Sequence, residues 1–160
     1  MSLVIFSAEG AKRTLEAHSG KLGLPWAFVK DKVFKAVDFL RAENVFLVSA
    51  EDPDMINTVQ RAFQEGKNLE LNVASRQVKV LNKDAAKKLL TGLATAKFGP
   101  LWQKHETAIN KAFDAFYVYN IFVAACDVQA GAFVREHTKS TNVYLRTKQP
   151  AQPVGESLNA

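Results

Sequence analysis

The segment that most constrains this fold runs from Ala112 to Cys126 and reads AFDAFYVYNIFVAAC. Between Ala115 and Cys126 only Asn120 is plainly polar. A run this apolar needs cover on most of its sides, because exposed apolar surface is unfavourable in water. It is also shorter than the roughly 18 apolar residues that a membrane-spanning helix needs. The segment therefore belongs to a core or to an interface between subunits.

Two structures can account for this segment. A helix that starts after Gly99-Pro100 could continue as far as His137, with Gly131 as the expected break. Unbroken, it would span about 55 Å at about 1.5 Å per residue. Alternatively, Phe116–Val123 forms a strand, because aromatic and β-branched residues favour strands. The helical spacing of apolar residues over Ile109–Val123 and the length of the run favour the helix, so we predict a long apolar C-terminal helix.

Capping residues and prolines mark the other helices. Ser, Asp and Asn side chains accept hydrogen bonds from the unpaired amides of a first helical turn. Proline is tolerated in that turn because it lacks an N–H group, and glycine commonly follows a helix end. These signals predict helices over Ala8–His18 after Ser7, over Pro25–Glu43, from Asp52-Pro53 to about Gly66, and over Lys83–Ala96 after Asn82.

Short apolar runs and period-two alternation predict the strands. The expected strands are Leu3–Phe6, Val45–Val48, a hairpin of Leu69–Val73 with Val78–Asn82, and Asn142–Thr147. The order of elements is then β-α-α-β-α-β-β-α-α-β. The predicted fold class is mixed α/β (α+β) and helix-dominated, with short strands and one β-hairpin packed against about five helices.

The chain length suits one domain, and we predict a single globular domain over residues 1–147. Residues 148–160 combine two prolines and a glycine with few apolar side chains. This composition favours disorder, so we predict a disordered C-terminal tail. Phe6-Ser7-Ala8-Glu9 is similar to Val48-Ser49-Ala50-Glu51, but so short a match does not establish an internal repeat.

Cysteine usage and hydropathy bear on the compartment. Cys126 is the only cysteine, so no intrachain disulfide can form, which suits a reducing compartment. The apolar run Leu3–Phe6 is too short for a signal peptide, and no stretch reaches the length of a membrane span. We expect a soluble, cytoplasmic protein with no membrane partner.

Candidate catalytic and metal-binding groups are scattered along the chain. His18, His105 and His137 lie far apart, and neither an HExxH nor a CxxC motif is present. Cys126 has no basic residue near it in sequence that would lower the pKa of its thiol. Nucleotide-binding glycine loops are also absent from the sequence. We therefore predict a protein that is not an enzyme and that holds neither a metal nor a cofactor.

The net charge of +5 is unevenly distributed. Residues 1–75 carry nine basic and ten acidic side chains, whereas residues 76–104 alone carry seven basic side chains and one acidic. A concentrated positive field attracts polyanions and speeds their association. This basic block therefore favours a nucleic-acid partner.

Aromatic residues accompany the basic ones. Cationic side chains can follow a phosphate backbone, while aromatic rings stack on the bases of a single strand. Tyr144, Arg146 and Lys148 alternate along a predicted strand, so they should point to one face. The predicted nucleic-acid-binding residues are Arg76, Lys79, Lys83, Lys87, Lys88, Trp102, Lys104, Tyr144, Arg146 and Lys148.

These features predict a non-catalytic protein that binds single-stranded nucleic acid, DNA in preference to RNA. No helix-turn-helix, KH, RNP or zinc-finger pattern is present, so contacts to the phosphate backbone are favoured over sequence-specific reading of a duplex. Such a protein could be an accessory factor in replication or transcription and could recruit a polymerase.

The alternative prediction is a structural or adaptor protein that self-assembles through its apolar C-terminal helix. We expect a homo-oligomer, a dimer or a tetramer, joined partly through Ala112–Val134. Asn120 would then lie in the interface, where a polar residue can set the register of packed helices.

Overall fold

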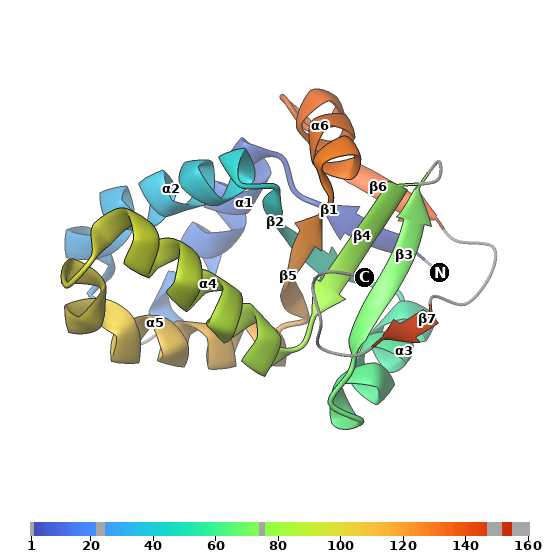
Figure 1. Cartoon of the computed structure of the whole chain (residues 1–160), viewed down its shortest axis with the longest axis horizontal. Helices are drawn as coiled ribbons and strands as arrows, with labels where there is room; N and C mark the ends of the chain where they lie inside the picture. The colour runs from blue at the N-terminus through green and yellow to red at the C-terminus, as the bar shows by residue number, and fades with distance from the viewer. Residues whose placement is uncertain (1, 22–24, 74–75, 147–151, 155–160) are drawn as a thin grey trace.

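The computed structural model describes residues 2–21, 25–73, 76–146 and 152–154 (Figure 1). Its strands form one sheet of seven, in the order β6-β1-β2-β5-β4-β3-β7, with every neighbouring pair antiparallel. The strands are β1 (Ser2–Ile5), β2 (Val45–Ala50), β3 (Asn68–Val73), β4 (Arg76–Leu81), β5 (Ile121–Cys126), β6 (Val143–Arg146) and β7 (Gln152–Val154).

Single helices and pairs of helices lie between strands along the chain. They are α1 (Ala8–Ala17), the short 3-10 helix η1 (Ser19–Lys21), α2 (Trp26–Ala42), α3 (Pro53–Gln64), α4 (Lys83–Phe98), α5 (Leu101–Val118) and α6 (Val128–His137). The prediction of a mixed α/β fold is therefore confirmed. The predicted caps are in place as well: the side chains of Ser7, Asp52 and Asn82 each accept a hydrogen bond from an amide of the following first turn.

The predicted long apolar C-terminal helix is wrong. Helix α5 ends at Val118, and Ile121–Cys126 forms β5 in the middle of the sheet, between β2 and β4. Asn120 makes the turn between them with a backbone φ of 59°, a left-handed conformation that asparagine tolerates better than most residues. A strand buried on both faces reads as a continuous apolar run, so hydrophobic periodicity alone could not separate it from the helix before it.

Two related predictions change with this correction. The strand that we considered over Phe116–Val123 exists, but it begins at Ile121. Asn120 lies in a turn rather than on a helical surface, where its side chain accepts a hydrogen bond from Gln60 Nε2 at 3.3 Å. In the predicted disordered tail, Gln152–Val154 forms β7 beside β3, while residues 148–151 and 155–160 lie outside the described part of the chain.

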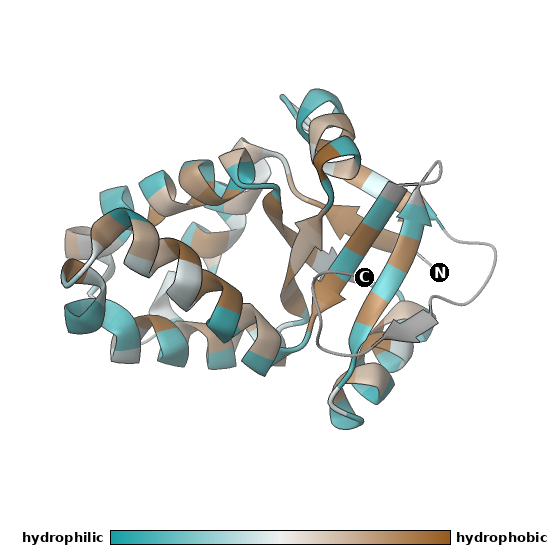
Figure 2. Ribbon diagram, viewed as in Figure 1, coloured by the Kyte–Doolittle hydropathy of each residue, from teal (hydrophilic) through white to brown (hydrophobic). Residues whose placement is uncertain are grey.

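The sheet is covered by helices on both faces. Strands β3 and β4 alternate between hydrophobic and hydrophilic residues along their length (Figure 2). One face packs against α3 and α6 in a core that includes Phe46, Phe122 and Met55. The other face carries two helical hairpins, α1 with α2 and α4 with α5, each with its own smaller core. In Figure 1 these hairpins extend together to one side of the sheet.

The chain contains an internal structural repeat. The elements β1-α1-α2-β2-α3-β3 are followed by β4-α4-α5-β5-α6-β6 in the same order, with corresponding residues 74 to 76 positions apart. We call residues 2–73 the N-terminal half and residues 76–146 the C-terminal half. The strand order is symmetric about the β2–β5 pair once β7 is set aside. The last strand of each half pairs with the first strand of the other half, β3 with β4 and β6 with β1, so the halves interlock.

Specific contacts repeat with the elements. Asn44 and Asn120 both make the helix-to-strand turn at positive φ, 62° and 59°. The backbone N–H of Ser7 donates to Asn142 Oδ1, and that of Asn82 donates to Asn68 Oδ1, both at 2.9 Å. These paired contacts make the repeat a property of the packing as well as of the topology.

The similarity between residues 6–9 and 48–51 is not this repeat. Ser7 caps α1, whereas Ser49 lies within β2 and Asp52 caps the next helix. The pseudo-two-fold axis passes between Leu47 and Val123, which correspond to each other and are paired directly across β2 and β5.

Candidate functional site

The predicted nucleic-acid-binding residues fall into separate places. Lys83, Lys87 and Lys88 are on α4, and Lys83 and Lys87 both contact the Asp114 carboxylate, at 3.3 and 3.1 Å. Their hydrogen bonds and charge hold the pKa of Asp114 below its usual range, the Lys87 bond contributing most. Lys104 is exposed on α5. The carboxylate neutralises part of the positive surface that the sequence suggests.

The remaining predicted residues do not join this group. Lys79 is only 3% exposed, because the alternation of β4 turns it toward the helical hairpins, at the position where the N-terminal half has Val4. Tyr144 and Arg146 are exposed on the edge strand β6, which β1, β2 and β5 separate from β4. Arg76 begins β4, and Lys148 lies outside the described residues. Trp102 is half-buried and belongs to a cavity wall.

Titratable groups give no sign of a catalytic or metal centre among the described residues. No three His, Cys, Asp or Glu side chains gather there as a metal site would require. Burial raises the pKa of the Cys126 thiol to about 12, which removes the thiolate that a nucleophilic cysteine needs. Within the same described part of the chain, no helix is long and apolar enough to cross a membrane.

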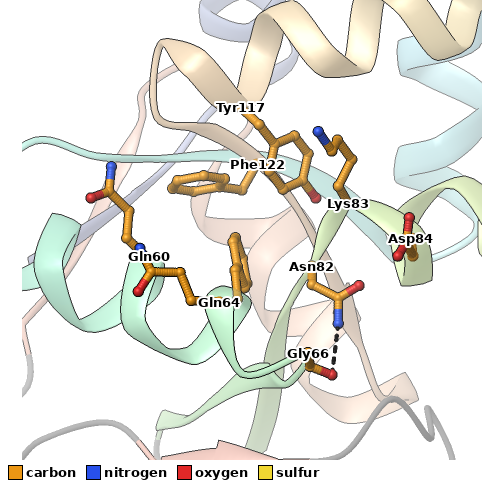
Figure 3. Close-up of a pocket in the computed structure, with 9 residues that line it drawn as sticks. Gln60, Gln64, Gly66, Asn82, Lys83, Asp84, Tyr117 and Phe122 are labelled. Atoms are coloured by element: carbon orange, nitrogen blue, oxygen red, sulfur yellow. Dashed lines mark hydrogen bonds between the residues drawn. The ribbon is translucent and has the colours of Figure 1, made fainter.

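A shallow pocket of about 360 Å³ lies at one end of the sheet (Figure 3). Tyr117 and Phe122 form its apolar wall, and Gln60, Gln64 and Asn82 stand around it. Several of its polar atoms already have partners: Tyr117 donates to the Leu81 carbonyl oxygen at 2.6 Å, and Asn82 donates to that of Gly66 at 3.3 Å. Polar atoms bonded within the protein offer few contacts to a ligand.

A larger cavity of about 480 Å³ lies between the two helical hairpins. Its floor is the centre of the sheet, including Val45, Leu47 and Val123 of β2 and β5, and its walls come from α1, α2, α4 and α5. The pseudo-two-fold axis therefore passes through its floor. This volume is within the range of about 300–1,000 Å³ that is typical of small-molecule sites.

Corresponding positions of the two halves line this cavity. Each half contributes apolar side chains from its hairpin and its central strand, in the pairs Leu15 and Leu90, Val33 and Ile109, Ala36 and Ala112, Val37 and Phe113, Leu40 and Phe116, and Leu47 and Val123. Phe39 of α2 and Phe98 of α4 also line the cavity and make an edge-to-face contact, with ring centroids 6.0 Å apart.

The polar lining of the cavity is sparse and positive. Among the described residues it consists of Lys32, Lys35 and Arg41 from α2 and Trp102 and His105 from α5, with no carboxylate. Lys32, Lys35 and His105 are exposed, so they stand at the rim. Arg41 instead donates to the Phe6 carbonyl oxygen at 3.0 Å and to Thr138 Oγ1 at 2.9 Å, which ties it to the protein.

Sequence reasoning missed this cavity. Its walls read as ordinary core positions of amphipathic helices, and only the three-dimensional arrangement leaves space between them. A signal was present, because Pro25-Trp26 and Pro100 with Trp102 recur at nearly the same offset as Asn44 and Asn120. Comparing the chain with itself at that offset would have revealed the repeat, although not the hollow on its axis.

Comparisons with known proteins leave the family open. No protein-family model matches the chain, and no curated protein or solved structure matches it either.

Proposed function

We propose that this protein is a non-catalytic binding protein for an apolar or amphipathic small molecule, housed in the cavity between the helical hairpins. The observation that carries the proposal is the cavity itself: about 480 Å³, walled by apolar side chains from both halves. Sites for small molecules are typically concave and mostly apolar, with a few polar groups that orient the ligand.

The energetic cost of an empty cavity supports an occupant. The cavity is open to solvent at its rim, and apolar walls in contact with water are unfavourable. Water that enters through the rim gains little from apolar walls. An apolar ligand would recover much of the lost contact.

Filling the cavity tests this proposal. Ala36→Trp places a large side chain on the wall, whereas Ala132→Trp places the same side chain on the exposed surface of α6 as a matched control. Thermal unfolding with and without 1-tetradecanol, followed by circular dichroism, reads out binding, because a ligand of the folded state raises Tm. The alcohol should raise Tm for the native chain and for Ala132→Trp but not for Ala36→Trp. Equal shifts in all three proteins would place binding elsewhere, and no shift in any would contradict the proposal.

Binding of single-stranded nucleic acid is a second proposal. It is favoured by Tyr144, which is 58% exposed on β6 with the exposed Arg146 two residues away. On a strand such residues share a face, as an aromatic and cationic contact to a single strand requires. A basic surface on α4 would add contacts to phosphates.

Gel-shift titrations with single-stranded DNA, duplex DNA and RNA test the second proposal. Affinity for the single strand should be measurable at moderate salt and fall steeply as salt rises. Lys87→Glu with Lys88→Glu should weaken it without unfolding the protein. Lys32→Glu with Lys35→Glu changes the net charge by the same amount on another helix and serves as the control. Negligible affinity, or affinity that does not depend on salt, would contradict this proposal.

Self-assembly and recruitment of a polymerase stay predictions. The segment Ala112–Val134, which we expect to join subunits, supplies the central strand β5 and parts of α5 and α6. Several large apolar side chains are nevertheless exposed among the described residues, namely Phe28, Leu101, Val118 and Val128. A mass measurement in solution tests whether they join copies of the chain.

A further inference from the structure

The mouth of the cavity between the helical hairpins combines exposed apolar and basic side chains. Phe98 and Leu101 line the cavity and are 43% and 60% exposed, so they lie at its rim. Lys32, Lys35 and His105 also line the cavity and are exposed. Exposed apolar side chains that gather at one place mark an interaction surface, whereas single ones do not.

The apolar surface continues from the rim toward the tips of the hairpins. Phe28 is 85% exposed in the first turn of α2. Residues four apart on a helix share a face, so Phe28 lies on the face of α2 that carries Lys32. Figure 1 places the start of α2 and the junction of α4 with α5 at the same end of the molecule, away from the sheet. We call this part of the molecule the hairpin end.

Basic side chains outnumber acidic ones at the hairpin end. Residues 25–36 and 97–106 include two acidic residues, Asp31 and Glu106, and five lysines, namely Lys30, Lys32, Lys35, Lys97 and Lys104. Lys30 is paired with Glu16 at 2.7 Å. The cavity lining among the described residues holds no carboxylate. The surface around the mouth is therefore both apolar and positively charged, which suits an anionic partner that also has an apolar phase.

Other partners fit this surface less well. A two-fold contact between copies of the chain brings the same surface from both subunits together, so rim lysines would meet rim lysines, which is unfavourable. Nucleic-acid bases stack on flat rings, and Leu101 has none. An anionic bilayer suits both components, because its head groups attract lysines and its acyl region takes apolar side chains.

We infer that the hairpin end contacts the surface of an anionic lipid bilayer. Phe28, Phe98 and Leu101 enter the boundary between head groups and acyl chains, and the lysines lie among the head groups. This inference rests on the proposed function and adds the source of its ligand, because the mouth of the cavity opens where the bilayer is. The expectation of no membrane partner came from the lack of a long apolar segment, which a peripheral contact does not need.

Sedimentation with lipid vesicles tests the contact. The full chain is mixed with vesicles of phosphatidylcholine alone and with vesicles of phosphatidylcholine and phosphatidylglycerol in equal parts. Each lysine near an anionic surface strengthens binding about fivefold, so the chain should bind the anionic vesicles about tenfold or more tightly than the neutral ones. Equal binding to both, or binding to neither, would overturn the inference.

Replacing exposed apolar side chains tests which surface enters the bilayer. Phe28→Ser with Leu101→Ser should weaken binding to anionic vesicles about tenfold, because less apolar area is buried in the bilayer. Val118→Ser with Val128→Ser is the control, since these side chains are 74% and 76% exposed at the end of α5 and the start of α6. Circular dichroism checks the fold of both variants. Equal weakening by the two pairs of substitutions would contradict a contact at the hairpin end.

Charge removal tests the lysines in the same way. Lys32→Gln with Lys35→Gln should weaken binding to anionic vesicles about tenfold. Lys67→Gln with Lys139→Gln removes two exposed lysines that follow α3 and α6, the helices on the other face of the sheet. This control should leave vesicle binding unchanged. If it weakens binding as much as the α2 variant does, binding follows net charge and the inference fails.

The tryptophans report where the bilayer lies. Trp26 and Trp102 are the only tryptophans of the chain, and they lie in the first turns of α2 and α5, at the hairpin end. Bromine quenches indole fluorescence at short range, so anionic vesicles with brominated acyl chains should quench the native protein. Sedimentation without quenching would mean that another surface binds the vesicles.

Thermal unfolding with 1-tetradecanol separates this inference from the proposed function. If the alcohol raises Tm but the vesicles do not bind, the inference is wrong and the proposed function stands. If the vesicles bind but the alcohol does not raise Tm, the proposed function fails, and with it the membrane as the source of a ligand. If single-stranded DNA displaces the protein from vesicles and Phe28→Ser with Leu101→Ser binds them like the native chain, the surface binds polyanions in general and the assignment to a membrane is wrong.

Discussion

The N-terminal and C-terminal halves build the same scaffold, and one difference between them lies where a side chain bridges the hairpin to the sheet. Arg41 and Tyr117 occupy corresponding positions near the ends of α2 and α5. Arg41 donates to the Phe6 carbonyl oxygen at 3.0 Å, and Tyr117 donates to the Leu81 carbonyl oxygen at 2.6 Å. Residues 6 and 81 also correspond, so two different side chains make the same bond.

The surroundings of these two side chains follow the same pattern. The Arg41 guanidinium lies over the Phe46 ring at 5.3 Å, whereas Tyr117 packs edge-to-face against the corresponding ring of Phe122 at 5.2 Å. The scaffold therefore requires a hydrogen-bond donor and a planar group at this position but does not require a charge. In the N-terminal half the donor is charged and also lines the cavity, which adds positive charge beside an apolar space. This difference between the halves places a charged donor in the cavity lining on the N-terminal side only.

The largest expected effect tests whether the two halves share the core equally. Phe46 and Phe122 are both about 2% exposed and belong to the same hydrophobic core. Phe46→Ala and Phe122→Ala should each lower the free energy of unfolding by about 3–5 kcal/mol, because each leaves a buried cavity. Urea unfolding measures both costs. If one variant cost less than half as much as the other, the halves would not be equivalent in stability despite their shared topology.

Alkaline pH should act on the C-terminal half through two buried acidic groups. Burial raises the pKa of both Tyr117 and Cys126, the latter to about 12, whereas the corresponding N-terminal residues are Arg41 and Ala50. Above pH 9 the unfolded chain loses the Cys126 proton while the folded chain keeps it. The contribution of this thiol to the free energy of unfolding is therefore fully present below about pH 9. It falls by about 1.4 kcal/mol per pH unit toward pH 12.

Replacing Cys126 by alanine, the residue at the corresponding position 50, isolates the contribution of the thiol. Cys126→Ala should flatten the decline of unfolding free energy between pH 9 and pH 11, measured by urea unfolding at each pH. Ala50→Cys is the converse variant and should steepen the decline if its thiol is buried as fully. An unchanged slope for Cys126→Ala would mean that the thiol does not titrate differently in the folded and unfolded states.

The corresponding donors Arg41 and Tyr117 should differ in their cost. Arg41→Met leaves the Phe6 carbonyl oxygen and Thr138 Oγ1 without this donor, so we expect a loss of about 2 kcal/mol. Tyr117→Phe removes one hydroxyl and keeps the ring, so about 1 kcal/mol should be lost. Thermal and urea unfolding of both variants measure the difference. A greater loss for Tyr117→Phe would contradict the view that the charged donor carries more bonds.

Local signals in the sequence were sufficient to predict most elements of both halves. Ser7, Asp52 and Asn82 each begin the helix that their side chains predict, because capping is decided within one turn of chain. The β3–β4 hairpin was also predicted, since its alternation is local. These features need no knowledge of the rest of the molecule.

The missed features depend on contacts between distant residues. Strand β5 is buried by β2, β4 and helices on both faces, and nothing within Ile121–Cys126 itself distinguishes such a strand from a buried helix. Lys79 is buried because of what packs over β4, although its charge predicted exposure. The cavity depends on how far apart two hairpins are held, which no single segment determines. The fold class was therefore predictable, and the candidate site was not.

The smallest expected effect concerns the charged surfaces of the two hairpins. Lys12 contacts Asp38 at 3.1 Å, and the corresponding Lys87 contacts Asp114 at 3.1 Å with Lys83 added at 3.3 Å. Asp38→Asn and Asp114→Asn should each cost less than about 1 kcal/mol, because exposed ion pairs contribute little. The pKa of Asp114 is lowered, so its share is present near neutral pH and is lost as acid protonates the carboxylate.

Nucleic-acid affinity gives these small substitutions a second readout. Asp114→Asn removes the carboxylate that neutralises Lys83 and Lys87, so under the second proposal it should strengthen binding to single-stranded DNA. Asp38→Asn changes the net charge equally but acts on α2, and it should have the smaller effect. If both variants strengthen binding alike, the interaction follows net charge alone and α4 is not the contact surface. If neither variant strengthens binding, the result contradicts a role for the basic block of residues 76–104 in binding a polyanionic partner.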